Sequence, residues 1–275
     1  MKSIIIGGGS IGIRHFNNLK KLNVDVKVVD IDEIDNIDSI LSNTIFNFGL
    51  VCTPTNLHLE HTLKLAEYGI DFFCEKPFFA KKDLEIINKI RKLINENNLI
   101  NMVGCNMRFH PAIKSFDYSN VCNINVTFGY DLKKWHNNGK HLKSYSANKI
   151  MGGGILLDAI HEFDYIYNWF GGIKEIYGKK QKVGNVTVDT EDVVDAKVLF
   201  ENGVSANIHL DYLQMKYTRY FEVENKKINI KPNDDMYIEE MKYFIDCVEN
   251  RKKCMNNIND AVYLIDKIND GIDGY

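Results

Sequence analysis

Residues 2–12 read KSIIIGGGSIG, a short apolar run followed by a cluster of glycines. The run has the length of a buried strand, and residues 11–22 continue with apolar side chains at helical spacing. Gly7, Gly9 and Gly12 therefore form a G-x-G-x-x-G motif at a strand-to-helix turn. There the first glycine permits the tight turn, the second admits a pyrophosphate, and the third packs helix against strand. The stretch predicts a dinucleotide-binding loop, and the alternative is an ordinary glycine turn.

The next hundred residues alternate between strand-like and helix-like patterns. Apolar runs lie at 26–30, 49–54, 71–77 and 100–105, and helical patterns lie at 56–68 and 82–97. Such alternation predicts βαβ units with a parallel sheet. The second strand ends at Asp30, where a carboxylate accepts hydrogen bonds from the adenosine ribose. Further acids follow, and residues 28–63 contain no Lys or Arg, so we expect NAD rather than NADP.

Beyond residue 110 the pattern changes. Strand-like runs lie at 121–132, 173–183, 192–212 (with a hairpin turn at Asn202-Gly203) and 217–230, and helical patterns lie at 154–169, 236–249 and 258–269. Strands without intervening helices predict an antiparallel sheet with helices on one face. The fold class is therefore α/β: residues 1–110 form a Rossmann-type dinucleotide-binding domain with a parallel sheet. Residues 111–275 form an α+β domain with an open, mostly antiparallel sheet for substrate binding and oligomerisation.

Oligomerisation is expected from the open face of this second sheet. The runs VVDAKVLF (193–200) and VSANIHL (204–210) carry apolar residues on both sides, with Val194, Ala196 and Val198 on one face. A large exposed apolar patch is unfavourable on a monomer, so a homodimer or homotetramer is predicted.

Composition excludes several function classes. The chain has 275 residues, of which 45% are hydrophobic and 26% charged, with a net charge of −3, so no basic field favours nucleic acid. No apolar run approaches the ~18 residues of a membrane span, and MKSIIIGGG is too short for a signal peptide, so a cytoplasmic protein without membrane contact is expected. The six cysteines form no CxxC pair and no cluster of metal ligands is visible in the sequence, so no metal site is expected, and disulfides are not expected in a reducing compartment.

The stretch FFCEKP (72–77) ends an apolar strand with an acid, a base and a proline. Pro54, Pro77 and Pro111 each follow a predicted parallel strand, and ligands bind at the carboxyl ends of such strands. Proline there fixes φ and ends strand pairing, and the Lys-Pro bond can be cis. We therefore expect Lys76 to project into a ligand crevice, the alternative being a solvated surface charge.

A second motif, GGGILLDAIHEFDYIYNWFG, occupies residues 152–171. Asp158 and His161 are three residues apart and are predicted on one helix face, the arrangement of a positioned general base. A core histidine is the alternative. The preceding loop, 131–150, carries five lysines and several aromatic and histidine side chains, namely Trp135, His136, His141 and Tyr145. It is either a lid over a sugar-like substrate or a solvated loop.

Together, the motifs GGGSIGIRH, CTPTNLHLEH, CEKP, NMRFHP and GGGILLDAIHEFDY resemble the Gfo/Idh/MocA oxidoreductases, the group of glucose–fructose oxidoreductase and inositol 2-dehydrogenase. The resemblance implies a nicotinamide cofactor, a catalytic Lys76, a general base at His161, and Asp158 orienting that base or binding substrate. The expected cofactor-binding residues are Gly7, Gly9, Ser10, Ile11, Gly12, Asp30, Thr53, Pro54, His58, Glu75, Lys76 and Asn106. The expected substrate-binding residues are Arg108, Trp135 and Tyr145 with Lys76, Asp158 and His161.

The activity that the resemblance implies is reversible oxidation of a secondary alcohol on a sugar, a sugar derivative (nucleotide-activated or acidic) or a cyclic polyol. Many members of the family place the histidine four residues after the aspartate, so Glu162 is the alternative base. Two other functions stay open: an NAD-dependent glycosidase, which needs a transient oxidation, and a non-catalytic regulator that senses NAD.

Overall fold

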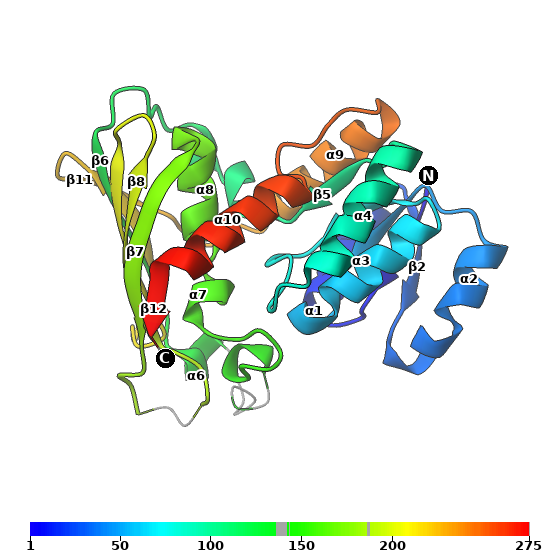
Figure 1. The fold of residues 1–275 in the computed structure, drawn as a ribbon, viewed down its shortest axis with the longest axis horizontal. Coiled ribbons are helices and arrows are strands. Elements are labelled where there is room, and N and C mark those ends of the chain that lie inside the picture. Colours follow the sequence, from blue (N-terminus) through cyan, green and yellow to red (C-terminus); the bar gives the residue numbers. More distant parts are fainter. Residues whose placement is uncertain (136–141, 143, 186–187, 275) are drawn as a thin grey trace. The chain divides into compact units, whose positions relative to one another are not determined.

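The computed structural model of the chain (Figure 1) describes residues 1–135, 142, 144–185 and 188–274. Its contacts group into two compact units. The first unit comprises Met1–Asn106 and Asp234–Ala261, and the second comprises Met107–Asn233 and Val262–Tyr275. No helix among the described residues is long and apolar enough to cross a membrane.

The first unit is built on a five-stranded parallel sheet with the strand order β2-β1-β3-β4-β5. Its strands are β1 (Lys2–Ile6), β2 (Asp25–Val29), β3 (Phe48–Val51), β4 (Asp71–Cys74) and β5 (Asn101–Val103). Ile4, Ile5, Phe72 and Phe73 are all fully buried. Neighbouring residues on one strand point to opposite faces, so both faces of this sheet are covered, which explains the continuous apolar runs in the sequence.

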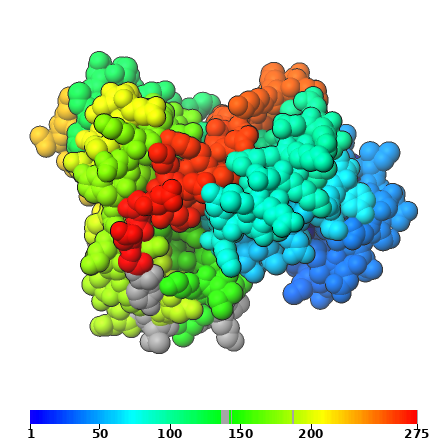
Figure 2. Space-filling model, in the orientation of Figure 1, coloured from blue at the N-terminus to red at the C-terminus, as the bar shows by residue number. Residues whose placement is uncertain are grey.

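Helices connect these strands as the alternating pattern predicts. They are α1 (Ser10–Lys21), α2 (Ile37–Asn43), α3 (His58–Glu67) and α4 (Leu84–Asn97). The 3-10 turn η1 (Ile31–Asn36) directly precedes α2 in the chain, and η2 (Thr55–Leu57) directly precedes α3. The Asp83 carboxylate caps α4 by accepting from the Ile86 amide at 3.1 Å, and Asn98 ends it at φ 51°. Helix α4 lies at the surface of the first unit (Figure 2) and buries only Ile87 and Ile90. The short η1 and α2 are not among the predicted elements.

Residues 234–261 group with the first unit, whereas the sequence-based division places them in the second domain. In α9 (Asp235–Glu249), Glu240 Oε1 accepts from the Cys105 amide at 2.6 Å. Phe244 lies edge-on to Phe48 and Phe73, with ring centroids 5.5 and 5.7 Å apart. These long-range contacts have no local signal, so a helix late in the chain joins the first core. The roles given to residues 111–275 stay predictions.

The second unit contains a seven-stranded mixed sheet with the order β11-β10-β6-β9-β8-β7-β12. Its strands are β6 (Asn123–Gly129), β7 (Ile173–Gln181), β8 (Val193–Phe200), β9 (Ser205–Asp211), β10 (Thr218–Val223), β11 (Lys226–Asn229) and β12 (Ile272–Gly274). The pairs β6–β9 and β7–β12 are parallel and the other pairs are antiparallel. The predicted fold class is thus confirmed, although β12 is not among the predicted strands.

Two hairpins shape this sheet. The predicted turn at Asn202-Gly203 joins β8 to β9, with Gly203 at φ +90°. The run 217–230 is not one strand as predicted, because Glu224 and Asn225 at φ 50° and 63° turn β10 back into β11. Positive φ at both central residues is what a two-residue hairpin with a type I′ turn requires.

The predicted helix 154–169 is wrong as a single element. It consists of α7 (Ile155–Asp158) and α8 (His161–Phe170), because Ala159 leaves the helical conformation at φ −100°, ψ 25°. Asp158 therefore ends one helix and His161 begins the next, and the argument that they share one helix face is also wrong. Other helices within the described parts of the chain are η3 (Asn106–Phe109), α5 (Pro111–Lys114), α6 (Leu132–Trp135), η5 (Tyr145–Ala147) and α10 (Ile258–Gly271).

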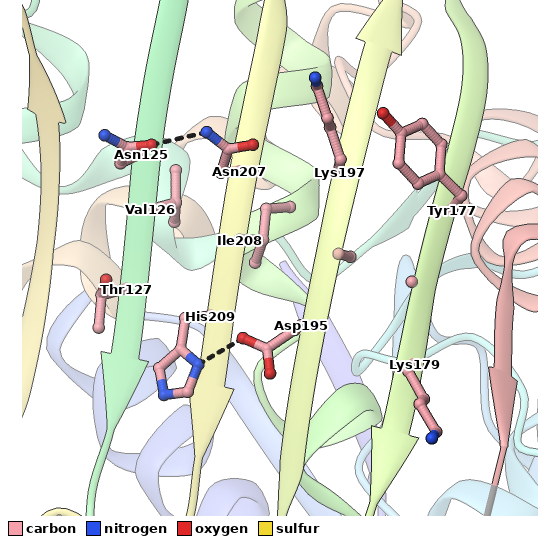
Figure 3. Close-up of a pocket in the computed structure, with 12 residues that line it drawn as sticks. Asn125, Val126, Thr127, Tyr177, Lys179, Asp195, Lys197, Asn207, Ile208 and His209 are labelled. Carbon is pink, nitrogen blue, oxygen red and sulfur yellow. Dashed lines mark hydrogen bonds and ion pairs between the residues drawn. The ribbon is translucent and has the colours of Figure 1, made fainter.

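The open face of the second sheet is polar rather than apolar. Val194, Ala196 and Val198 share one face as predicted, but that face is buried, so these residues form no exposed apolar patch. Figure 3 shows the outward side chains, which come from β6, β7, β8 and β9 and include Asn125, Thr127, Lys179, Asp195, Lys197, Asn207 and His209. Asn207 donates to Asn125 at 2.8 Å, and His209 Nδ1 lies 2.7 Å from Asp195. The β-strand period of two places Val194, Ala196 and Val198 inward, and it puts Val193 and Leu199 on the outward side with Asp195 and Lys197.

Candidate functional site

The predicted cofactor residues of the first unit gather at one edge of its sheet. All five strands are parallel, so their carboxyl ends lie along the same edge, where ligands of doubly wound sheets bind. Gly7 follows β1, Asp30 follows β2, Thr53 follows β3, Lys76 follows β4 and Asn106 follows β5. Residues spread over a hundred positions of sequence are therefore neighbours along this edge.

The glycine loop after β1 has the shape of a phosphate cradle. Gly7 adopts φ +104°, and a Cβ atom on Gly12 would lie 2.0 Å from the Gly7 carbonyl oxygen, so neither position admits a side chain. A Cβ atom on Gly9 would meet nothing within 4 Å. Gly9 precedes α1 and offers no side-chain cap, so the first amides of the helix, at Ser10 and Ile11, face outward beyond the helix start.

Two further observations fit a dinucleotide. A Cβ atom on Gly8 would lie 2.7 Å from Asp30 Oδ2, so this exposed carboxylate lies against the loop, where a ribose diol would meet it. Asn106 Oδ1 is buried and has no hydrogen-bond partner among the described residues. A buried acceptor left unsatisfied costs about 1–3 kcal/mol, and a polar ligand can remove that cost. The residues present thus fit NAD.

Glu75, the acid of FFCEKP, is buried and tied to a histidine. His15 Nε2 lies 2.6 Å from Glu75 Oε1, and Glu75 Oε2 accepts from the Lys76 amide at 3.2 Å. Burial raises the pKa of Glu75. The hydrogen bond and charge of His15, together with the charges of Lys76 and His58, lower this pKa by more than burial raises it, so Glu75 is ionised. Lys76 itself is half-buried, and the Lys76–Pro77 bond is cis.

His58 and Thr53, predicted at the cofactor, are linked to each other. His58 Nδ1 lies 2.7 Å from the Pro77 carbonyl oxygen, and its Nε2 lies 2.8 Å from that of Thr53. Burial lowers the pKa of His58 more than these carbonyls and Glu75 raise it. Backbone carbonyl oxygens thus lie against both ring nitrogens of His58, and its expected place at the cofactor stays a prediction. Pro54 is exposed and Thr53 half-buried, so both keep surface at this edge.

In the second unit, Asp158 meets a tyrosine that sequence analysis missed. The hydroxyl of Tyr212, directly after β9, donates to Asp158 Oδ2 at 2.5 Å. Burial and then the charge of Asp158 raise the pKa of Tyr212 well above its usual range, so the phenol keeps its proton. The Trp135 ring lies 6.0 Å from the Tyr212 ring, and Tyr145 is close enough to act on its charge. The structure thus brings together Asp158 and the two predicted aromatic residues.

The glycine run before α7 is explained by two close approaches. A Cβ atom on Gly153 would lie 2.2 Å from the Tyr145 carbonyl oxygen, and one on Gly154 would lie 2.3 Å from Glu191 Oε1. Glu191, also missed, accepts from the Leu156 amide at 3.1 Å, and burial raises its pKa. No local pattern marks Glu191, because it is 35 residues from its partner. His136 and His141 of the predicted lid lie outside the described residues.

Two neighbouring carboxylates are held by arginines. Glu162, fully buried, accepts from Arg219 Nε and Nη2 at 2.6 and 2.8 Å. Asp164 accepts from Arg108 Nη2 and Nε at 2.6 and 2.9 Å. The fork of each guanidinium occupies both carboxylate oxygens. Because Arg219 binds both oxygens of Glu162, this geometry disfavours Glu162 as the base. The Arg108 side chain is bound to Asp164 of α8 in the same way.

His161 is the first residue of α8 and is 9% exposed. It belongs to the second unit with Asp158, whereas Lys76 and Glu75 belong to the first. Among the described residues, no group of three or more His, Cys, Asp or Glu side chains is arranged to hold a metal ion.

Comparisons with known proteins identify the family to which the chain belongs. Residues 1–105 match the family model described as "Oxidoreductase family, NAD-binding Rossmann fold", and residues 107–229 match the C-terminal domain model of the same family. The chain is 26% identical to oxidoreductase P35 of Formosa agariphila over 62% of this chain and 54% of that protein. It therefore spans about half the length of this curated relative.

A second relative is the 2,7-anhydro-N-acetylneuraminate hydratase of Mediterraneibacter gnavus, 26% identical over 54% of this chain and 39% of the hydratase. The crystal structure of myo-inositol 2-dehydrogenase from Lactobacillus plantarum shares the fold, with a TM-score of 0.77 at 18% identity, covering 96% of this chain and 94% of that one. Since the two family models together cover residues 1–105 and 107–229, the chain belongs to the Gfo/Idh/MocA family of oxidoreductases, with an NAD-binding Rossmann domain at its N-terminus.

Proposed function

We propose that the chain is an NAD-dependent dehydrogenase that reversibly oxidises a secondary alcohol of a sugar, a sugar derivative or a cyclic polyol. The observation that carries the proposal is the shared carboxyl edge of the first sheet. There the glycine cradle, the Asp30 carboxylate and Lys76 follow three strands of one parallel sheet. A cationic side chain at the edge that binds the cofactor is suited to a reacting oxygen.

The chain's own groups take the following roles in this proposal. NAD, when bound, supplies or accepts the hydride. His161 removes the hydroxyl proton as general base. Lys76 donates a hydrogen bond to the reacting oxygen, and Asp158, held by Tyr212, orients His161 or binds a substrate hydroxyl. Glu75 is ionised and fixed by His15, so it supports the Lys76 backbone rather than exchanging protons.

The aromatic residues favour a substrate with a sugar-like ring. Trp135 and Tyr145 lie by Tyr212 and Asp158, so apolar ring faces are next to a carboxylate that accepts hydrogen bonds. Sugars and polyols present both kinds of surface. The crystallised inositol dehydrogenase supports the same class, as does the sialic acid derivative named for the hydratase. A nucleotide-activated or acidic sugar is the finer proposal.

A second candidate is the elimination or hydration of a sugar through a transient oxidation, as in an NAD-dependent glycosidase. The hydratase relative is the observation that favours it. Such a cycle returns the hydride to the same molecule, so no reduced cofactor accumulates. A regulator that only senses NAD would instead show no turnover at all.

The test is a substrate screen with the purified protein. Sugar nucleotides, acidic sugars and cyclic polyols are each incubated with NAD, and the absorbance of reduced cofactor and the mass of each sugar are followed. Rising absorbance with an oxidised sugar supports the dehydrogenase. A changed sugar mass without net absorbance change supports the second candidate. No change in either signal across a panel that contains all three substrate classes would contradict both.

We also propose a homodimer or homotetramer. The main support is the family resemblance, because the open face of the second sheet is polar. A polar face can still pair through complementary hydrogen bonds, as between Asn125, Asn207 and the Asp195–His209 pair. Light scattering that finds only a monomer of 31.7 kDa at micromolar concentration would contradict this proposal.

A further inference from the structure

Two buried histidines hold the backbone around Lys76, one on each side of this residue. On the amino side, His15 contacts the Glu75 carboxylate at 2.6 Å, and that carboxylate accepts from the Lys76 amide at 3.2 Å. On the carboxyl side, His58 contacts the Pro77 carbonyl oxygen at 2.7 Å. His15 and His58 are 0% and 1% exposed. Neither histidine has a role in the proposed chemistry.

These contacts matter because the segment that carries Lys76 has no regular secondary structure of its own. Strand β4 ends at Cys74 and α4 begins at Leu84, and residues 75–83 form neither helix nor strand. The second nitrogen of His58 reaches the Thr53 carbonyl oxygen at 2.8 Å. His58 therefore joins the loop after β4 to the loop after β3, and one imidazole sets the spacing of two strand ends at the cofactor edge.

We propose that His58 is a positioning residue for Lys76, acting through its Nδ1 contact with the Pro77 carbonyl; this inference rests on the proposed function of Lys76. The His15–Glu75 pair fixes the other side of the same residue. A catalytic group must be held in a narrow range of positions, and a displacement of about 1 Å can cost on the order of 10²-fold in rate. The cofactor-binding role expected for His58 is thereby replaced by an indirect one.

The hydrogen-bond count on His58 supplies a sharp test. Both partners are carbonyl oxygens, which only accept, and a neutral imidazole donates through one nitrogen at a time. An asparagine amide matches the position of Nδ1, near Pro77, and a glutamine amide matches that of Nε2, near Thr53. His58→Asn can thus restore the contact beside Lys76, whereas His58→Gln can restore only the contact to the neighbouring loop.

The experiment compares His58→Asn, His58→Gln and the control Glu60→Gln, whose side chain is exposed on the same helix. With a substrate from the screen, we expect His58→Gln to lower kcat about 10- to 100-fold at little-changed KM for NAD, and His58→Asn to retain at least tenfold more kcat than His58→Gln. Deuterium uptake of residues 75–83, measured without substrate, should rise in His58→Gln and stay lower in His58→Asn.

Equal kcat and equal uptake in the two histidine variants would overturn the proposal. A raised KM for NAD with unchanged kcat would also overturn it, because His58 would then act in cofactor binding. If no substrate is found, the deuterium uptake still decides whether His58 holds the segment, so failure of the proposed function and failure of this inference are separate results.

Discussion

Three acidic side chains within one stretch of the second unit are equally buried but differently partnered. Asp158, Glu162 and Asp164 are 2%, 0% and 5% exposed. Arginine forks hold Glu162 and Asp164 through both oxygens, whereas Asp158 meets the neutral hydroxyl of Tyr212 through Oδ2. A guanidinium fork satisfies both oxygens of a carboxylate and neutralises its charge. The two arginine pairs therefore fit a structural role, and Asp158 stays the carboxylate for which we propose a role in the chemistry.

The largest expected effect is the loss of folding stability when an arginine–carboxylate pair is broken. Arg219→Met leaves Glu162 buried without its cation, which should cost about 3–5 kcal/mol of unfolding free energy. Both tryptophans, Trp135 and Trp169, belong to the second unit, so their fluorescence during urea denaturation reports on it. The control Lys226→Met changes an exposed lysine of β11 in the same unit and should change little. Equal shifts in both variants would break the comparison.

Asp158 and His161 should affect turnover rather than folding. His161→Ala should lower kcat by about 10²–10⁴-fold, the usual value of a positioned general base. Asp158→Asn should be milder if the carboxylate only orients, and Tyr212→Phe milder still, because it removes one hydrogen bond and leaves the Asp158 carboxylate itself in place. Urea midpoints near that of the parent protein must accompany these losses. A loss of stability as large as that of Arg219→Met would place Asp158 with the structural carboxylates.

Asp30 extends the comparison to an exposed carboxylate at the cofactor edge. A 2′-phosphate there would meet Asp30 and the acids after it, so NADPH should bind at least tenfold more weakly than NADH, which corresponds to about 1.4 kcal/mol. Fluorescence titration of both reduced cofactors measures the ratio. Asp30→Ala should bring the two affinities closer together. Equal or tighter NADPH binding by the parent protein would refute the NAD preference.

The smallest effect should come from the open sheet face. Asp211 and Asp195 lie 3.1 and 2.7 Å from His209, and hydrogen bonds to them raise its pKa to about 9. A raised histidine pKa stabilises the fold fully below the ordinary value of 6.5, and this stability is lost as pH rises through about 9. Because the His209 side chain is 41% exposed, solvent screens the gain to below about 1 kcal/mol. In Asp195→Asn, the fall in urea midpoint from pH 6.5 to 9 should shrink, and an unchanged slope would contradict this account.

Local patterns were sufficient to predict most elements and one edge of the site. The glycine loop, Asp30 and Lys76 each follow a strand directly, so a parallel sheet brings them together without long-range information. The turn at Glu224-Asn225 was missed because neither residue alone marks a hairpin as strongly as Asn-Gly does.

Partners from distant parts of the chain could not be predicted. Tyr212 and Glu191 reach the glycine-run segment from 54 and 35 residues away, and no residue near either one signals it. The sequence could not predict which side of the sheet is exposed, because both sides of VVDAKVLF contain apolar residues. The place of β8 between β7 and β9 in the folded sheet decides which side is buried. Helix α9 joins the first unit through Glu240 and Phe244, again by tertiary contacts.

The central claim, that Lys76 acts in the chemistry at the cofactor edge, is tested most directly by Lys76→Met. Turnover and NADH affinity are measured on the same preparation, with Lys81→Met, an exposed lysine of the same segment, as the control. The account predicts that Lys76→Met abolishes turnover while the Kd for NADH changes less than about threefold, and that Lys81→Met changes neither. Loss of NADH binding as large as the loss of turnover would make Lys76 a cofactor anchor and contradict the claim.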